Sequence, residues 1–240
     1  MELHICHLYP DLLNSYGDIG NVLIMARRLE RRGIDAVIHN ITIGDEFHKE
    51  DYDIVFFGGG QDFEQAIVSE DLKKNKKDEL QAYIEEGKVF IAICGGYQLL
   101  GHYYMSAENE KLEGLHILDI HTEKGDKRAI NNLILQDGDR YYAGFENHSG
   151  RTYIGDLKPL GKVAYGFGNN GEDGYEGCRY KNTIGTYLHG PLFTKNPELC
   201  DEVLETALSL RYGKEIKLDQ LDDTFEMKAK QVVLHRYLEK

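Results

Sequence analysis

The sequence predicts an α/β fold with a mostly parallel central sheet and a β-rich second half. In the first half, apolar runs of strand length alternate with amphipathic segments of helical length, which is the pattern of βαβ units. The runs Asp53–Gly60 and Val89–Cys94 are almost wholly apolar, as expected of parallel strands that are buried on both faces. From about Leu115 the chain changes to short β-rich runs separated by Gly, Asn and Asp turns.

The elements follow in a simple order. The expected strands and helices are strand Glu2–Tyr9, helix Ile19–Arg32 with Gly33 as its C-cap, strand Asp35–Ile41, strand Asp53–Gly60, a mostly helical segment Asp62–Glu86, strand Val89–Cys94, several β-rich runs, and helices near Pro197–Arg211 and Thr224–Tyr237. Four prolines and no low-complexity stretch leave no obvious linker. We therefore expect a single domain over residues 1–240, with a C-terminal helical extension over about 214–240.

The last expected helix carries an apolar stripe that includes Phe225, Ala229 and Val232 at helical spacing. Packing on its own domain is the simpler interpretation of this stripe. Contact with a partner is the alternative.

Charge and cysteine usage exclude several classes of protein. The chain has 41 acidic and 28 basic residues, and such an acidic surface disfavours binding to nucleic acid or to an anionic membrane. The first residues show no signal-peptide pattern, and no apolar run approaches the ~20 residues of a membrane span. The four cysteines form no CxxC pair, so we expect no metal site. These features favour a cytoplasmic protein.

The segment "VFIAICGGYQLLG" (Val89–Gly101) is the strongest local signal. Cys94 ends a strand and Gly95–Gly96 opens a helix, which is the context of a nucleophile elbow. A helix N-terminus stabilises a thiolate, and its N–H groups can hold an oxyanion. We expect the glycines both to permit the turn and to let a substrate approach. A buried structural cysteine is the competing interpretation.

A nucleophilic cysteine needs a base, and His189 is the first candidate. It follows the β-like run Ile184–Leu188 and precedes Gly190–Pro191, which places it at a second strand end. His148 is the rival, because it lies at another strand end with Glu146 on the same face. A structural hydrogen-bond pair is an equally good interpretation of Glu146 and His148.

Several motifs together resemble a known family. "AICGGYQLLG" resembles the nucleophile segment of class I glutamine amidotransferases, and "DIVFFGGG" resembles their oxyanion strand. "TYLHGPLF" is similar to the cobyric acid synthase-like branch. With "SYGDIGN", "GGGQDFEQA" and "GFENHSGRTY" in this order, the chain to about Gly213 looks most like the GatD family of glutaminase subunits. The resemblance implies a flavodoxin-like, three-layer fold.

The resemblance also implies a set of site residues. Cys94 matches the nucleophile and His189 the base. Gly95 matches one oxyanion donor, and Gly59 or Gly60 would supply the other.

Two further residues match positions that hold the substrate. Gln98 matches a position that helps to hold glutamine. Arg128 matches an arginine that binds its α-carboxylate, as a guanidinium fork suits that group. A solvated loop charge is the alternative for Arg128.

One departure concerns the group that orients the base. Many class I amidotransferases have a glutamate two residues after the histidine, but Pro191 stands there. The cobyric acid synthase-like branch also lacks this glutamate. We therefore expect a Cys94–His189 dyad, with any orienting group absent or supplied from elsewhere. Glu146 is a weak candidate.

The resemblance implies a function in cell-wall synthesis. The chain would hydrolyse L-glutamine and pass ammonia to a MurT-like Mur ligase subunit, which would use ATP to amidate D-glutamate of lipid II to D-isoglutamine. No GxxxxGK[ST] motif is present, so we expect no cofactor in this chain and ATP on the partner. Contact with lipid II would also belong to the partner.

Three other functions stay open at this point. A stand-alone γ-glutamyl hydrolase or other cysteine hydrolase would share the layout, although Gly95 replaces the histidine usual after the nucleophile in the PfpI/DJ-1 branch. A catalytically dead regulatory subunit is disfavoured because Cys94 and His189 are both present. An amidotransferase subunit for another acceptor, such as a corrin, is the third.

Overall fold

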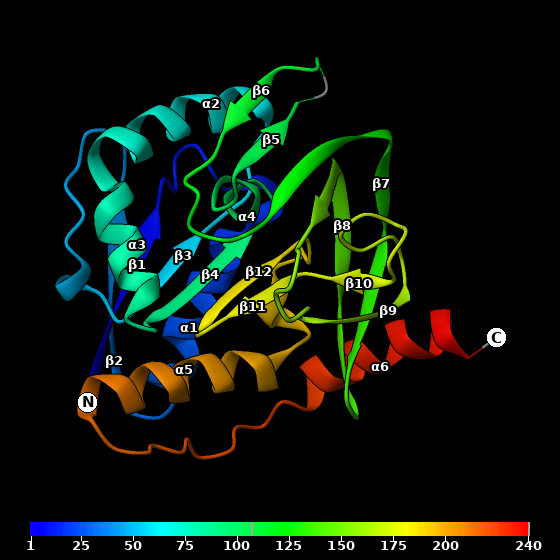
Figure 1. Cartoon of the computed structure of the whole chain (residues 1–240). Helices are drawn as coiled ribbons and strands as arrows, with labels where there is room; N and C mark the ends of the chain where they lie inside the picture. The colour runs from blue at the N-terminus through cyan, green and yellow to red at the C-terminus, as the bar shows by residue number, and fades with distance from the viewer. Residues whose placement is uncertain (107, 240) are drawn as a thin grey trace.

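Two sheets organise the chain, one mostly parallel and one mostly antiparallel. The computed structural model describes residues 1–106 and 108–239, and within them each sheet has six strands. Figure 1 shows the first sheet between helices and the second beside it. Lys240, the last residue of the expected extension, lies outside the described residues.

The first sheet carries the α/β half of the fold. In spatial order its strands are β11 (Cys178–Tyr180), β12 (Thr183–Thr186), β4 (Val89–Ile93), β3 (Ile54–Phe57), β1 (Glu2–Leu8) and β2 (Asp35–Ile41). All neighbours pair in parallel except β11, which is antiparallel to β12. Every residue of β3 and β4 is buried, as their apolar sequences predict.

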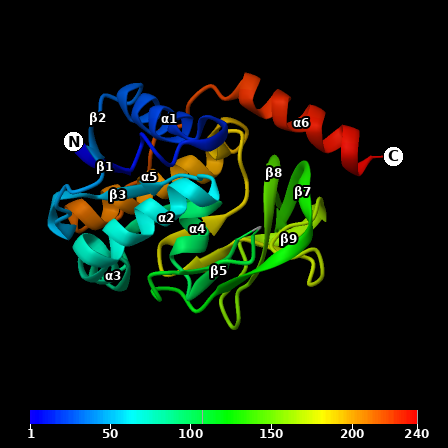
Figure 2. The ribbon, with the colours of Figure 1, turned by 90° about the horizontal axis from the view of Figure 1, so that it is seen from above.

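Helices cover both faces of this sheet (Figures 1 and 2). On one face α1 (Ile19–Glu30) packs against α5 (Pro197–Tyr212). The other face carries α2 (Asp62–Asp71), α3 (Lys77–Glu85) and the short α4 (Gly95–Leu99). The expected three-layer α/β class is confirmed.

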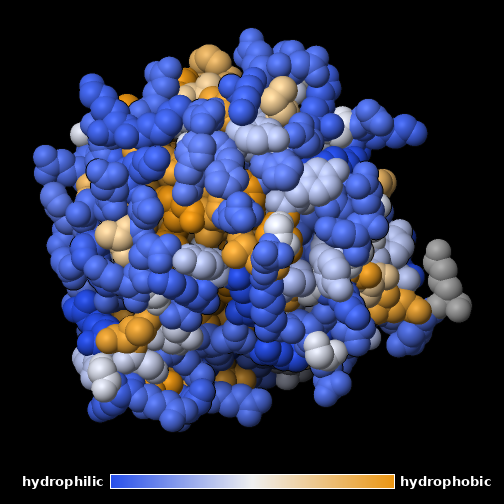
Figure 3. Space-filling view, viewed as in Figure 1, coloured by the Kyte–Doolittle hydropathy of each residue, from blue (hydrophilic) through white to orange (hydrophobic). Residues whose placement is uncertain are grey.

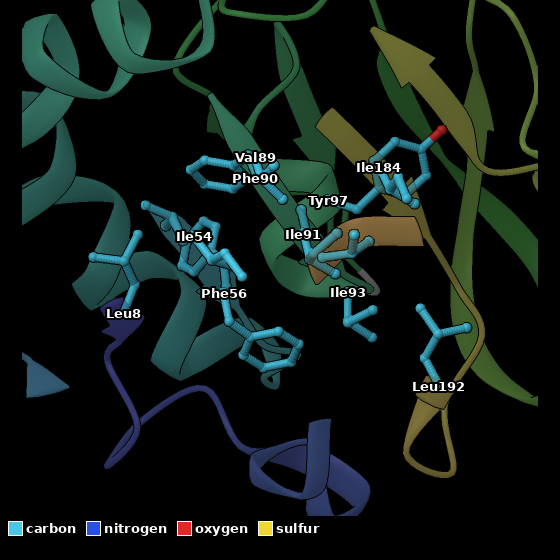
Figure 4. Close-up of a cluster of buried hydrophobic side chains, with 14 of the residues drawn as sticks. Leu8, Ile54, Phe56, Val89, Phe90, Ile91, Ile93, Tyr97, Ile184 and Leu192 are labelled. Carbon is cyan, nitrogen blue, oxygen red and sulfur yellow. The ribbon is translucent and has the colours of Figure 1, made fainter. Parts of the chain in front are cut away.

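The core lies between these layers. Figure 4 shows apolar side chains of β1, β3, β4 and β12 meeting there, among them Leu8, Phe56, Ile91 and Ile184. The face of the molecule in Figure 3 is mostly hydrophilic, with apolar side chains gathered in a hollow near its centre. None of the helices in the described chain is both long and apolar enough to cross a membrane.

Register aligns the carboxyl ends of four parallel strands. Leu8 pairs with Phe57, and Phe57 pairs with Ala92, so β1, β3 and β4 end together. Thr186 pairs with Ile93, which brings the end of β12 to the same edge. Ligands bind at this edge in open α/β sheets, so the loops after these strands are placed to form a site.

The second sheet differs from the expected run of short strands. Its strands are β5 (Tyr103–Met105), β6 (Lys111–Glu113), β7 (His121–Asp137), β8 (Arg140–Tyr153), β9 (Gly161–Tyr165) and β10 (Tyr175–Glu176). Two expected runs are parts of the long β7–β8 hairpin, whose register shifts between Lys124 and Ala129. Internal Gly and Asn residues suggested turns, but the ladder continues through them because the partner strand satisfies their backbone groups.

The last helix, α6 (Thr224–Leu238), lies along β8 and β9 (Figure 1). The expectation that its apolar stripe packs on the domain is wrong for Phe225, Ala229 and Val232, because all three are exposed, Phe225 by 82% and Val232 by 68%. Contact instead comes from Lys230, which pairs with Glu198, and from Tyr237, which packs on Tyr165. Periodicity located the helix but did not identify its inner face.

Candidate active site

Cys94 occupies a strained turn between β4 and α4. Its φ of 50° and ψ of −105° are unusual for a residue with a side chain. The N–H donates to the carbonyl of Thr186 (2.9 Å), and the carbonyl accepts from the N–H of Gln98 (2.9 Å). These bonds hold the thiol at the sheet edge, with the residue 7% exposed.

The expectation that the glycines after Cys94 supply the unusual backbone angles is wrong, and in the structure these glycines make room for neighbouring protein atoms. Positive φ belongs to Cys94, not to Gly95 or Gly96. A Cβ on Gly95 would lie 2.9 Å from the Gln65 amide and 3.0 Å from the Gly60 nitrogen. Residue 95 must therefore lack a side chain for α4 to begin against the loop after β3.

His189 lies at the end of the segment that follows β12. Its N–H and carbonyl pair with those of Phe145 at 2.8 and 3.1 Å, which anchors it to β8. The ring is fully buried, and the ring of Tyr16 packs edge-on against it at 4.9 Å. Its Nδ1 lies 3.2 Å from Oδ1 of Asp18.

Asp18 is the orienting group that the sequence analysis did not identify. It is fully buried just before α1, and its Oδ2 accepts the N–H of Gly59 at 2.9 Å. One carboxylate therefore fixes both the histidine ring and the loop after β3. The signal was present in "SYGDIGN", which carried the family resemblance without a role for its aspartate.

The environment of His189 favours the imidazolium. Burial acts to lower the pKa of His189, but the hydrogen bond with Asp18 and the interaction with the Cys94 thiol together raise it to about 10. Nε2 has no partner of normal hydrogen-bond geometry among the described residues. A proton exchange with Cys94 would use this nitrogen, and such contacts commonly tighten when substrate binds.

Gly59 shows how closely these three side chains meet. A Cβ there would lie 3.1 Å from Cβ of Cys94, 3.1 Å from Cε1 of His189 and 3.4 Å from Oδ2 of Asp18. All three groups therefore surround one point. Only glycine leaves that point open.

Of the two glycines expected to supply an oxyanion donor, Gly60 is placed better than Gly59. The N–H of Gly59 is already bonded to Asp18. Within the described chain no hydrogen bond is formed by the N–H of Gly60 or of Gly95, and the two residues are adjacent. Gln65 supports this pair, because its Nε2 donates to the carbonyl of Gly60 at 3.1 Å.

A cavity of about 300 Å³ opens beside the thiol. Cys94, Gln98 and Arg128 all line it, so the structure brings these expected residues together. Gln98 donates from Nε2 to the hydroxyl of Tyr187 at 3.0 Å. Arg128 comes from the irregular part of β7 and is held by both the side-chain and backbone oxygens of Asn147.

Glu146 does not orient His189. Its two oxygens accept the N–H groups of Phe167 and Gly168 at 2.7 and 2.9 Å. The histidine nearest to it is His148, whose Nε2 lies 3.6 Å from Oε2 of Glu146. The alternation of β8 placed Glu146 and His148 on one face correctly, but it could not show that Asp18, from far along the chain, would reach His189 first.

A strained cysteine at the edge of a parallel sheet, a buried histidine–aspartate pair and two free N–H groups define a class of enzyme with a thiol nucleophile. The model of the CobB/CobQ-like glutamine amidotransferase domain matches residues 4–197. The chain therefore belongs to the CobB/CobQ-like glutamine amidotransferases.

Two relatives narrow the family. The GatD subunit of lipid II isoglutaminyl synthase (glutamine-hydrolysing) from Streptococcus pneumoniae is 44% identical, over 92% of this chain and 86% of the relative. That of Staphylococcus aureus is 42% identical, over 98% and 96%. At this similarity the chain is a member of the GatD family.

The fold has a solved counterpart. PurLQS from Thermotoga maritima superimposes with a TM-score of 0.57 at 17% identity, over 88% of this chain and 100% of that chain. At this identity the likeness shows the shared fold alone.

Proposed function

We propose that this chain is the glutaminase subunit of a lipid II isoglutaminyl synthase and hydrolyses L-glutamine to glutamate and ammonia. The observation that carries the proposal is the meeting of Cys94, His189 and Asp18 around Gly59, beside the cavity that Arg128 lines. Membership in the GatD family supports the same substrate.

The first half of the reaction forms an acyl-enzyme. The α-carboxylate of glutamine binds Arg128, and the Cys94 thiolate attacks the side-chain amide carbon. The N–H groups of Gly60 and Gly95 hold the oxyanion. The His189 imidazolium gives its proton to the leaving nitrogen, the C–N bond breaks, and ammonia departs from a γ-glutamyl thioester.

The second half releases glutamate. Neutral His189 takes a proton from water, the hydroxide oxygen bonds to the thioester carbon, and the C–S bond breaks. Asp18 keeps the ring oriented through both halves. No metal or cofactor in this chain takes part in these steps.

Ammonia is the useful product. We propose that it passes to a MurT-like Mur ligase subunit in a heterodimer. That partner would bind ATP and lipid II and convert D-glutamate of the stem peptide to D-isoglutamine. Free ammonia is mostly protonated at neutral pH, which favours direct transfer over release.

The test compares the purified chain with Cys94→Ala. Glutamate release from glutamine is measured with and without the Mur ligase partner, and lipid II amidation by mass spectrometry with ATP present. Hydrolysis and amidation that both disappear in Cys94→Ala support the proposal. Full activity of the chain alone on γ-glutamyl peptides, with no amidation, favours a stand-alone γ-glutamyl hydrolase.

A further inference from the structure

Glu64 is a carboxylate without a partner in the wall of the cavity that Cys94 lines. The residue is half-buried, and its Oε2 is buried without a hydrogen-bond partner among the described residues. Buried polar atoms in native proteins are nearly always hydrogen-bonded, so an unpaired carboxylate oxygen in a cavity wall calls for an explanation, and a ligand with a donor group is one.

Arg128 provides the opposite charge on the same cavity. The hydrogen bonds of its guanidinium go to the neutral Asn147, and it forms no ion pair with Glu64 or with any other carboxylate in the described chain. The two unpaired charges come from different elements, Glu64 from the first turn of α2 and Arg128 from β7.

A ligand that pairs with both residues needs a cationic group for Glu64 and an anionic group for Arg128 within one cavity of about 300 Å³. An α-amino acid carries both on one carbon. We propose that Glu64 accepts the α-ammonium of the substrate while Arg128 takes its α-carboxylate, so that the cavity selects a free amino-acid amide. This specificity role rests on the proposed glutaminase function.

Other acids of the cavity are placed less well for this role. Asp62 already accepts the hydroxyl of Tyr104 at 2.7 Å. Glu108 is exposed, so water competes for its charge. Glu64 also lies in the first turn of α2, where a negative charge favours the helix, and that structural role is the main alternative.

The experiment uses L-glutamine and glutaramate, which is glutamine without its α-amino group. Wild type is expected to prefer glutamine by about tenfold to a hundredfold in kcat/KM, the range of a hydrogen bond to a charged group. Glu64→Gln is expected to remove most of this preference by raising KM for glutamine. It should change the glutaramate reaction much less than the glutamine reaction, because glutaramate has no ammonium group to lose a partner.

Two matched variants serve as controls. Glu70→Gln removes an exposed charge from the same helix and is expected to keep the preference. Glu108→Gln removes the competing acid. The proposal is overturned if Glu64→Gln weakens both substrates by one factor, as a structural role would, if it leaves the preference intact, or if Glu108→Gln abolishes the preference instead.

A binding experiment distinguishes failure of the ammonium contact from failure of the proposed glutaminase function. L-glutamine and glutaramate are titrated into Cys94→Ala and into Cys94→Ala/Glu64→Gln by calorimetry. If wild type hydrolyses neither amide but Glu64-dependent binding of glutamine persists, the glutaminase proposal fails and the ammonium contact stands. If hydrolysis occurs but Glu64 affects neither binding nor KM, only the ammonium contact fails.

Discussion

The two buried histidines near the nucleophile have opposite chemistry, although each lies beside one buried carboxylate. The pKa of His189 is raised to about 10. The pKa of His148 is lowered, because burial outweighs the contribution of Glu146. Both side chains are almost wholly inaccessible, so burial alone does not decide the outcome.

The difference lies in how each carboxylate uses its oxygens. Asp18 gives one oxygen to Gly59 and keeps the other for the ring of His189. Glu146 gives both oxygens to backbone N–H groups and approaches His148 only at 3.6 Å.

The ring of His148 makes packing and hydrogen-bond contacts within the fold. It stacks on Tyr187 with centroids 3.6 Å apart, and its Nδ1 bonds to the carbonyl of Gly150. A neutral ring suits this packing role. Of these two histidines, the one whose carboxylate keeps an oxygen free for the ring has the raised pKa, and the other has the lowered pKa.

The largest difference in activity is expected between two variants that each replace one of these histidines. His189→Ala is expected to lower kcat for glutamine hydrolysis by about a hundredfold to ten-thousandfold, the usual contribution of general acid–base catalysis. His148→Phe keeps the stacking on Tyr187 and is expected to stay within about tenfold of wild type, since its ring transfers no proton. Steady-state glutamate release measures both.

Equal losses in the two variants would contradict this division of roles. Thermal unfolding of each variant is the control, because both rings are buried and either exchange can loosen the fold.

The sequence was sufficient for the framework and for the local elements of the site. Alternation of apolar runs with helices gave the parallel sheet, and the strand–Cys–Gly–Gly–helix order gave the Cys94 turn. Asp18 was missed because no local pattern connects it with His189. Their contact depends on β1 and β12 ending at the same edge of the sheet, which only strand order and register determine.

Gly59→Ala tests whether activity depends on the close approach of Cys94 and His189 around residue 59. The added methyl would lie 3.1 Å from both Cys94 and His189, so one of them must shift. A shift of a few tenths of an ångström is enough to relieve these contacts, and we expect it to lower kcat by up to about tenfold. Activity is compared with thermal unfolding, and a loss of stability in proportion to the loss of kcat would indicate general disruption instead.

Asp18→Asn tests the charge that separates the two histidines. Asp18 raises the pKa of His189, so its neutral replacement is expected to lower that pKa. The alkaline limb of kcat/KM should move to lower pH, with activity falling about tenfold near the optimum.

The pH profile of Glu146→Gln is the matched control. His148 is already held neutral, so this variant should leave the alkaline limb in place. An unmoved limb in Asp18→Asn would show that the limb reports another group.

The smallest expected effect is on stability and concerns Glu176, which lies between His148 and His189 through its contacts with Thr186 and Tyr187. It is fully buried and accepts the hydroxyl of Thr186 and the N–H of Tyr187, the residue that stacks on His148 and precedes the segment to His189. Burial raises the pKa of Glu176 to about 8 despite these hydrogen bonds, and the charge of Glu146 adds to the rise.

A raised carboxyl pKa means that the native state keeps a proton that the unfolded chain releases. Between about pH 4.5 and 8 the free energy of unfolding should therefore fall as the pH rises. Glu176→Gln removes the titrating group, so its denaturation midpoints should fall less than those of wild type over this range. Parallel curves for the two proteins would show that Glu176 is ionised in the native state, with its charge stabilised by Thr186 and Tyr187 alone.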